Sequence, residues 1–596
     1  MATVVRDVER KYDPAGAGPA ALEAVGGMIG VAGVAAVTPR EEQILDAVYY
    51  DTKDLRLLRA GVTLWRRTGG ADAGWHLKLP AGAASGEEIR LPLTAPAGRP
   101  AGKPAGDAAS GRAGTPAITP RARTAGTVPE KLAALVRSRT QGAALAPVMR
   151  MRTSRGILRL LDEGSRTLAE IAADHVSAEP AAGSAATSWE EIKVELVTGG
   201  PKLLKAIDAR LRRAGARPAV TATKLQRALG DQWPAVMVAE GSPLAAQSAA
   251  GQVVLGYLRQ QVAAIARYDP LVRLDEPDAV HQMRVATRRA RSALQAFGTI
   301  IDREATRPLC EELKWLAAEL GQARDGEVLL ARLTAELAAI PPALVAGPVQ
   351  ARITGHFTAE LRQAGTAARH VLDGQRYLRL LHDLDVLLAD PPMTSLAGRT
   401  AGKALAKPVR RAARRLQRAL AAVPAAEDQD EAIHEARKAA KRARYAAETA
   451  LPALGGTARR QAMRAKKLQD LLGDHHDSVV TRTVLRDLAS QARAAAEDTF
   501  TYGVLHERQA CHAARIERTL PHFATSAKKP NLLQLPSGPS GLRALGPWTA
   551  ADRQTQGDRL PISLAVVAAA PRLMRLPWHP SRSGGRTGRG QYRGWR

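Results

Sequence analysis

Hydrophobic and polar positions change their spacing once along the chain, and this change separates a strand-rich part from a helical part. Up to about residue 197, apolar and polar residues alternate in short runs. One such run, Asp7–Tyr12, places Asp7, Glu9 and Lys11 on the same face of a strand. From about residue 245 to about residue 520, Ala, Leu and Arg recur with the helical period. We therefore expect a β-rich domain followed by an all-α domain.

Turn residues and changes in composition locate the elements and domains. The segments 149–161 and 166–176 predict a hairpin around Asp162-Glu163-Gly164. Further strands are expected at 46–51, 61–68, 75–79, 87–93 and 188–197, and helices at 18–36, 202–214 and 223–229. The expected domains are residues 1–230, with a flexible insertion at 94–127, then a linker at 231–248, a helical domain at 249–525 and a disordered basic tail at 526–596.

An internal duplication is the strongest signal in the helical part. The segment HQMRVATRRAR at 281–291 returns as HEARKAAKRAR at 434–444, with His and basic residues in matching places. Each copy is followed by the pattern Leu-x-x-x-Leu-Gly-x-x-x-Asp, which ends at Asp325 in the first copy and at Asp477 in the second. The separations from His to Asp are 44 and 43 residues. Solubility alone does not require such matching, so the repeated basic helix face predicts a functional surface.

Composition narrows the class of partner. A formal net charge of +28 predicts a polyanionic partner, which could be nucleic acid, an anionic membrane or polyphosphate. Two cysteines, Cys310 and Cys511, exclude a disulfide framework and fit a reducing compartment. The longest apolar run near the end, 562–570, is too short to span a membrane. We therefore expect a cytoplasmic protein, with polyphosphate granules as a candidate location.

Charged residues of both signs alternate on several predicted strands of the first domain. The acids considered as metal ligands are Asp7, Glu9, Glu170, Asp174, Glu191 and Glu195, and the accompanying bases are Lys11, Arg66, Arg67, Lys78, Arg90, Arg150, Arg152 and Lys224. One interpretation is a solvated sheet face with cross-strand ion pairs. The other is a barrel whose interior holds Mg²⁺ or Mn²⁺ on carboxylates and a phosphate chain on Lys and Arg. Alternation alone leaves both interpretations open.

The first domain also resembles the CYTH family of triphosphate tunnel enzymes. The resemblance lies in DVERKY (7–12), YYDTKDLRLLRAGVTLWRRTGG (49–70), WHLKLP (75–80), EEIRLPL (87–93) and TKLQRAL (223–229). It implies an antiparallel β tunnel that binds triphosphate with a divalent ion, Mg²⁺ or Mn²⁺. The implied metal ligands are Asp7, Glu9, Glu170, Asp174 and Glu195. The implied catalytic residues are Lys11, Arg67 and Lys78. The implied triphosphate ligands are Arg66, Arg90, Arg150, Arg152 and Lys224.

This sequence departs from the family pattern at a few positions. Asp7 replaces the usual first Glu, Trp65 stands where the strand usually carries its first Arg, and Ala173 and Lys193 stand where related sequences often carry an acid. The tunnel is therefore compatible with two functions, which are hydrolysis of triphosphate or polyphosphate and binding without turnover.

The two histidines of the duplication, His281 and His434, have three possible roles from the residues alone: metal ligand, hydrogen-bond donor to phosphate, or structural residue. The neighbouring group Asp474, His475, His476 and Asp477 cannot all bind one ion, because adjacent side chains on a helix diverge by about 100°. A basic helix face by itself is most often a solvated surface, and only the duplication argues against that interpretation here.

The helical domain resembles the CHAD domain, the conserved-histidine α-helical domain. The resemblance lies in AVHQMRVATRRARSALQAF (279–297), LGQARDGEVLLARL (320–333), AIHEARKAAKRARYAAE (432–448) and KLQDLLGDHHDSV (467–479). It implies two pseudo-symmetric four-helix bundles around a basic channel for inorganic polyphosphate. The implied channel residues are His281, Arg284, Arg288, Arg291, His434, Arg437, Lys438, Lys441 and Arg444, and the basic run 403–418 adds Arg411, Arg414 and Arg415.

Three functions compete at this point. The first is a polyphosphate-binding protein whose β domain hydrolyses the chain, and the second is a binder of polyphosphate or triphosphate alone. The third is a nucleic-acid-binding protein, which the net charge permits. An aromatic content of 4% disfavours stacking on bases, and no helix-turn-helix or zinc motif is present. The sequence favours the first two, predicts no membrane span and leaves the oligomeric state open.

Overall fold

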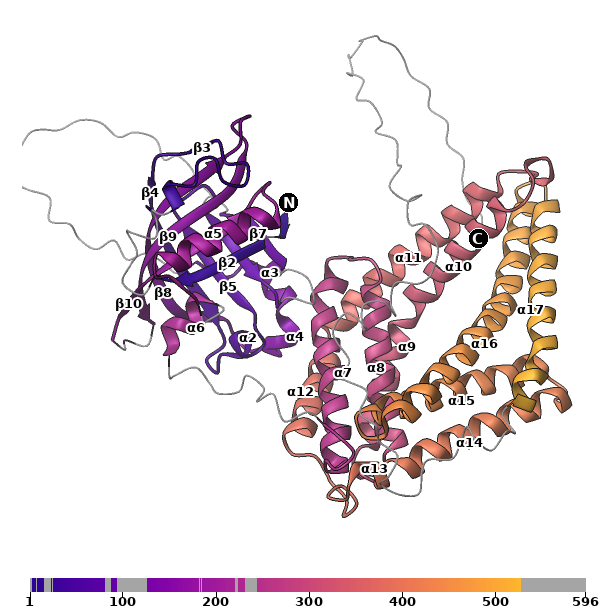
Figure 1. Cartoon of the computed structure of the whole chain (residues 1–596). Coiled ribbons are helices and arrows are strands. Elements are labelled where there is room, and N and C mark those ends of the chain that lie inside the picture. The colour runs from indigo at the N-terminus through magenta and orange to yellow at the C-terminus, as the bar shows by residue number, and fades with distance from the viewer. Residues whose placement is uncertain are drawn as a thin grey trace, which may run out of the picture. The chain divides into compact units, whose positions relative to one another are not determined.

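The computed structural model of the chain describes an antiparallel β domain followed by a helical domain (Figure 1). The described residues are 3–6, 8–14, 23, 25–80, 87–93, 126–181, 183, 185–219, 223–230 and 244–526. Within this part, side chains are described except at 3–6, 8, 87, 322–325 and 521–526. Several predicted features therefore lie outside the described residues: Asp7, residues 231–243 of the predicted linker, almost all of the predicted insertion, and the tail from residue 527. The side chain of Asp325 also lies outside them.

Eleven strands of the described residues form one antiparallel sheet. They are β1 (Thr3–Arg6), β2 (Val8–Asp13), β3 (Ala36–Val37), β4 (Glu41–Asp51), β5 (Thr63–Thr68), β6 (Gly74–Lys78), β7 (Glu87–Pro92), β8 (Ala146–Leu161), β9 (Thr167–Pro180), β10 (Thr187–Leu196) and β11 (Arg217–Pro218). Their order is β1-β7-β6-β5-β4-β8-β9-β10-β2-β11, and β3 pairs with β8. This order confirms the hairpin expected around residues 162–164.

The sheet closes on itself through its first two strands. β1 pairs with β7 at one end of the path, and β2 pairs with β10 near the other end. Only residue 7 separates β1 from β2 along the chain, so the two ends of the path meet in one stretch of backbone. Glu9 on β2 accordingly pairs both with Lys193 on β10 and with Lys78 on β6. We refer to the inner face of this closed sheet as the tunnel.

Apolar residues occupy the outer face of the sheet. Leu203, Ile207 and Leu211 of α5 (Pro201–Arg213) pack on Ile171 and Val194 of the sheet. Leu132 and Leu135 of α3 (Glu130–Leu135) join a second outer cluster over β5, β6 and β7. Burial of these apolar surfaces stabilises the domain from outside.

Short helices complete the β domain. α2 (Arg56–Arg59) and α4 (Arg137–Thr140) lie in connections, and α6 (Lys224–Leu229) packs Leu225 and Ala228 on Met149, Met151 and Val176. The register of the sheet places these three sheet residues on the tunnel face, so α6 covers one end of the tunnel. The helix expected at 18–36 is wrong beyond residue 26, where turns lead into β3, because glycines at 30 and 33 adopt positive φ.

Long helices build the second domain. They are α7 (Ala250–Arg273), α8 (Ala279–Ala296), α9 (Arg307–Glu319), α10 (Gly321–Ala338), α11 (Val349–Asp373), α12 (Gln375–Ala389), α13 (Ala401–Ala404), α14 (Ala406–Ala422), α15 (Gln429–Thr449), α16 (Leu451–Ala494) and α17 (Phe500–Ser526), with 3₁₀ turns η2 (Pro342–Leu344) and η3 (Val423–Ala425). Among the described residues, no helix is long and apolar enough to cross a membrane.

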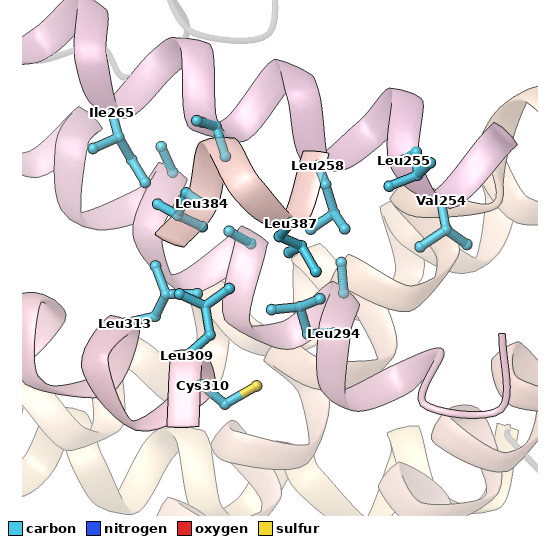
Figure 2. Packing of buried hydrophobic residues seen from close by; sticks show 14 of the residues in the cluster. Val254, Leu255, Leu258, Ile265, Leu294, Leu309, Cys310, Leu313, Leu384 and Leu387 are labelled. Carbon is cyan, nitrogen blue, oxygen red and sulfur yellow. The ribbon is translucent and has the colours of Figure 1, made fainter. Parts of the chain in front are cut away.

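The duplication is visible in how the helices pair. In the first copy α7 packs on α8, α8 on α9, and α10 on α11; in the second copy α14 packs on α15, α15 on α16, and α16 on α17. The Leu-Gly pattern divides α9 from α10 in the first copy but lies inside the continuous α16 in the second. The largest core of the domain joins Leu258 and Ile265 of α7 with Leu294 of α8, Leu313 of α9 and Leu384 of α12 (Figure 2). This packing brings α8 and α15, the two helices with the repeated His and Arg residues, into contact.

Candidate functional site

Charged side chains of both signs fill the tunnel. Lys193 Nζ on β10 lies 2.5 Å from Glu195 Oε2 and 3.6 Å from Glu9 Oε2. Glu9 Oε1 accepts a hydrogen bond from Lys78 Nζ at 2.9 Å. Glu9 and Glu195 stand directly opposite each other on neighbouring strands, where two carboxylates repel unless a cation separates them.

A second group of tunnel residues surrounds Asp174, whose carboxylate is almost completely buried. Arg155 donates two hydrogen bonds to it, Nε to Oδ1 at 2.7 Å and Nη2 to Oδ2 at 2.8 Å. Lys224 on α6 donates a third at 2.5 Å and lies 3.6 Å from Glu191. At this end of the tunnel the two carboxylates, Asp174 and Glu191, balance the two cations, Arg155 and Lys224.

Further ion pairs line the remaining strands. Arg159 pairs with Glu170 at 3.2 Å and with Glu41 at 2.9 Å. Glu88 accepts a hydrogen bond from Arg90 and contacts the His76 ring, each at 2.8 Å. This part of the tunnel also contains the Arg67–Asp72 pair and the stacking of Trp65 on Tyr49 and His76.

The pKa values follow from burial and from these partners. Burial raises the pKa of Glu9, but Lys11, Lys78 and Lys193 lower it further, so that the pKa is about 2. Asp174 behaves in the same way, because Lys224 and Arg155 outweigh burial and hold its pKa at about 2. Burial is the main cause of the lowered pKa of Lys11. Glu9 and Asp174 are therefore ionised at neutral pH.

The register of the strands separates the predicted tunnel residues into two groups. The structure brings Glu9, Lys11, Arg67, Lys78, Arg90, Glu170, Asp174, Glu195 and Lys224 to the tunnel. It does not bring Arg66, Arg150 and Arg152 there, because each stands at the opposite parity of its strand. Arg150 and Arg152 are exposed, and Arg66 and Arg150 both lie near Tyr50 on the outer side.

Sequence reasoning left several tunnel residues out of the predicted set. Arg155 and Arg159 stand two and six positions beyond Thr153, on the inward parity of β8, and Glu41 and Glu88 also face inward. Alternation on β8 carried the signal, but it could not tell which parity faced the tunnel. The sequence singled out Lys193 only because it stands where related sequences often carry an acid, and did not predict a role for it in the tunnel.

The second candidate site lies where α8 meets α15. Lys441 of α15 is surrounded by Arg288, Arg437 and Arg284, and the carboxylate of Asp477 opposes their effect on it. Burial and the three guanidinium groups lower the pKa of Lys441 from 10.5 to about 6. We call Arg284, Arg288, Arg437 and Lys441 the basic cluster. Like charges this close destabilise the folded chain unless an anion binds among them.

The glycine of each Leu-Gly pattern lies against an arginine of the basic cluster. A Cβ atom on Gly321 would lie 3.3 Å from Arg284 Nη2, and a Cβ atom on Gly473 would lie 3.8 Å from Arg437 Nε. Arg284 donates a hydrogen bond to the carbonyl of Ala317 at 3.2 Å, and Arg437 lies 3.8 Å from Asp477. The repeated sequence pattern therefore supports the repeated arginine.

The histidines of the second copy lie beside the basic cluster. The rings of His434 and His476 are 4.9 Å apart. Burial, together with Arg437, His434 and Lys441, lowers the pKa of His476 to about 4. His475 points elsewhere, to Glu517 at 2.8 Å and Asp430 at 3.6 Å. His475 and His476 therefore have different neighbours, as their divergence along a helix predicts.

Other predicted channel residues have acidic partners. Arg444 donates a hydrogen bond to Glu448 at 2.7 Å, and Lys438 donates one to Glu435 at 2.6 Å. His281 and Arg291 are half-buried on α8, and Arg291 acts on Arg442 of α15. The structure thus places Arg284, Arg288, Arg437 and Lys441 at one point and leaves Arg444 in a carboxylate network.

A hollow of about 490 Å³ adjoins α14 and α15, lined by Arg411, Arg415, Arg418, Ala419, Glu435 and Ala439. Arg414 is exposed on the same helix. Burial is the main cause of the lowered pKa of Arg442 on α15, and the positive charge of Arg415 on α14 lowers it further. Basic side chains of α14 and α15 therefore lie near one another. We call this the arginine hollow.

Comparison with known proteins identifies the helical part. The CHAD domain family matches residues 256–486. Two proteins from strains of Mycobacterium tuberculosis, both called uncharacterized protein, are 37% identical over 507 residues, which cover 82% of this chain and 91% of theirs.

Solved structures with similarity include a CHAD domain from the plant Ricinus communis, 26% identical, covering 49% of this chain and 96% of that chain, with a TM-score of 0.40. A putative adenylate cyclase from Bacillus halodurans is 15% identical and covers 38% of this chain and 99% of that chain, with a TM-score of 0.22.

Proposed function

The chain belongs to the same family as the two mycobacterial proteins, and its residues 256–486 are a CHAD domain. We propose that this helical domain binds inorganic polyphosphate. The observation that carries the proposal is the basic cluster. Arg288, Arg437 and Arg284 act with burial to lower the pKa of Lys441 to about 6, and Asp477 opposes them. A chain of phosphates supplies several negative charges in a narrow space and would contact all four bases together.

The geometry favours polyphosphate over nucleic acid. The basic cluster is half-buried between α8 and α15, whereas a duplex needs a broad exposed surface or a helix that enters its groove. Arginine forks bind phosphate oxygens in bidentate fashion without reading a base. The arginine hollow offers a second group of bases for a longer chain.

The β domain supports a related proposal, that the tunnel receives a triphosphate or the end of a polyphosphate chain. Its closed sheet holds Lys and Arg side chains inside, and Lys11, Arg67, Lys78, Arg90 and Lys224 are the proposed ligands of the phosphoryl oxygens. Outer helices cover the apolar face, so the charged interior is a property of the fold and not of an exposed sheet surface.

Hydrolysis through Mg²⁺ or Mn²⁺ would require the predicted carboxylates, Asp7, Glu9, Glu170, Asp174 and Glu195, to converge on an ion. Asp7 lies outside the described residues, and each of the other four instead pairs with a lysine or an arginine. Among the described side chains, ligand atoms of three His, Cys, Asp or Glu residues come within 4.8 Å of one another at Asp430, His475 and Glu517, and at no set of tunnel carboxylates. The described tunnel residues do not fit a divalent ion, and we therefore propose binding without turnover.

The test of polyphosphate binding is a pair of charge reversals in the basic cluster. We expect Arg288→Glu with Lys441→Glu to weaken binding of labelled long-chain polyphosphate by at least about 100-fold, since each lost charged contact contributes roughly 1.5–3 kcal/mol. Fluorescence anisotropy measures the affinity, and circular dichroism checks that helicity is retained.

The matched control makes the same charge change at exposed positions of the same domain, Lys314→Glu with Arg486→Glu. This control should lose less than about threefold, because exposed charges act through screened, long-range attraction. Equal losses in the two double variants would mean that overall charge, and not the basic cluster, binds polyphosphate.

A further inference from the structure

Lys193 occupies the position in the tunnel at which two carboxylates would otherwise meet. Glu9 and Glu195 face each other on β2 and β10. The ammonium group of Lys193, two residues before Glu195 on the same strand face, lies 2.5 Å from Glu195 Oε2 and 3.6 Å from Glu9 Oε2. The second oxygen of Glu9 is bound by Lys78 at 2.9 Å. Both carboxylates therefore already hold cations supplied by the chain.

The position of Lys193 decides what a divalent ion would meet here. Its ammonium group lies between the carboxylates of Glu9 and Glu195. An approaching divalent ion would therefore meet a positive charge already in place.

The electrostatic effect of Lys193 matches that of an acid with a bound metal. A carboxylate that holds a divalent ion carries one net positive charge, which is also the charge of an ammonium group. An ammonium can therefore attract a phosphate chain, but it offers no coordination position that would activate a water molecule. Binding is retained by this exchange, and Lewis-acid catalysis is lost.

We propose that Lys193 is a built-in cation of the tunnel, so that the β domain binds a phosphate chain without a divalent ion. The proposal rests on the proposed function in one respect, that the tunnel receives a phosphate chain. Its statement about the metal concerns Glu9, Lys193 and Glu195 alone and can be tested without any phosphate.

The primary experiment measures Mn²⁺ binding to the full chain by electron paramagnetic resonance, in buffer without phosphate. The wild type and Glu9→Gln should bind the same amount of Mn²⁺, because Glu9 holds no ion. A Mn²⁺ ion bound at Asp430, His475 and Glu517 would be present in both proteins, so it would not change the difference between them. A Mn²⁺ ion that the wild type binds and Glu9→Gln loses would overturn the proposal.

The reverse experiment creates the site. Lys193→Glu places three carboxylates at one point and should gain one Mn²⁺ per chain, which Lys193→Glu with Glu9→Gln should lose again. Lys205→Glu, at an exposed position on α5, makes the same charge change away from the tunnel and should gain none. If Lys193→Glu does not fold, Lys193→Gln supplies a neutral oxygen ligand in its place, and absence of a Mn²⁺ gain in every folded variant would count against the proposal.

Phosphate binding is measured separately, with inorganic tripolyphosphate and isothermal titration calorimetry. The background is Arg288→Glu with Lys441→Glu, which removes the basic cluster. Binding should persist in EDTA and fall at least about tenfold in Lys193→Gln, the loss of one charged contact. Binding that requires Mg²⁺ would overturn the role of Lys193. No binding under either condition would overturn the proposed function of the tunnel and leave the Mn²⁺ result standing.

Discussion

Lys441 is the residue at which stability and binding oppose each other. The folded chain holds its proton less tightly than the unfolded chain, because burial and Arg288, Arg437 and Arg284 lower the pKa from 10.5 to about 6. Between these pH values the unfolded state binds more protons, so the contribution of this residue to stability rises with pH across that window. At pH 7 the folded chain without a ligand therefore carries the penalty of this site.

Replacing Lys441 by Met should stabilise the free protein and weaken its binding of polyphosphate. We expect the free energy of unfolding at pH 7 to rise by about 1 kcal/mol, the usual gain from removing an unfavourable charge. The gain should shrink as the pH approaches 10, where the wild-type lysine no longer differs between the two states. Thermal unfolding at several pH values measures this. A destabilised Lys441→Met variant at pH 7 would show that Lys441 contributes to packing more than to charge repulsion.

Binding of a polyanion should return a proton to Lys441. Phosphate oxygens favour the ammonium form, so the pKa rises on binding and the complex takes up a proton between pH 6 and the higher bound value. Affinity should therefore fall as the pH rises from 6 to 8. Titration calorimetry at pH 7 in buffers of different ionisation enthalpy measures the proton uptake.

The control for proton uptake is Lys441→Arg, which retains the charge and does not titrate in this range. His434 and His476 also have lowered pKa values and can contribute protons of their own. The difference between wild type and Lys441→Arg isolates the lysine. Equal uptake by the two proteins would assign the protons to the histidines.

At the scale of helices, the two glycines of the Leu-Gly pattern give a matched pair of substitutions. Gly473 lies inside α16, and a Cβ atom there makes an ordinary 3.8 Å contact with Arg437. Gly473→Ala should therefore stabilise the chain by about 1 kcal/mol, the difference in helix propensity, with little effect on binding. Gly321 begins α10, and a Cβ atom there meets Arg284 at the tighter distance of 3.3 Å.

Gly321→Ala should consequently shift the guanidinium group of Arg284 and weaken polyphosphate binding by a few-fold, without the gain in stability. Chemical unfolding and anisotropy, measured on both variants, compare the two effects. If both variants bind polyphosphate as tightly as wild type, Arg284 can move without loss, and its position beside Gly321 has no role in the site.

The helix pattern predicted the basic cluster better than the strand pattern predicted the tunnel. On α8 and α15 a period of 3.6 residues fixes which residues share a face, so the duplicated spacing was enough to nominate Arg284, Arg288, Arg437 and Lys441 together. It could not show that Arg444 pairs with Glu448, because Glu448 stands one turn beyond the repeated segment. That pairing depends on the rotamers that the packed helices allow.

Alternation along a strand divides its residues between two faces of the sheet, but it does not identify which face lies inside the tunnel. Arg150 and Arg152 were chosen from one parity of β8, whereas Arg155 and Arg159 occupy the tunnel parity. The choice depends on register with β4 and β9 and on the helices that cover the outer face, and a one-residue error exchanges all inward and outward side chains. Such tertiary information is not present in a single run of alternating residues.

For the whole molecule, the question is whether net charge or local geometry selects the ligand. Residues 538–596 contain ten Arg and two Asp. They therefore supply part of the formal net charge of +28 that the whole chain carries. Deleting them removes more positive charge than Arg288→Glu with Lys441→Glu does, but leaves the basic cluster unchanged. Binding that follows net charge should therefore suffer more from the deletion, and binding at the cluster should suffer more from the double variant.

We expect the two ligands to respond in opposite ways to these two changes. Long-chain polyphosphate should lose at least about 100-fold in the double variant and less than about threefold in the deletion. Duplex DNA, held by the number of available cations, should lose more in the deletion and should show the steeper dependence on salt. Anisotropy with both ligands at matched charge and several salt concentrations makes the comparison. If the deletion weakens polyphosphate binding as strongly as the double variant does, the tail is part of the binding site, and the cluster on α8 and α15 does not explain selectivity by itself.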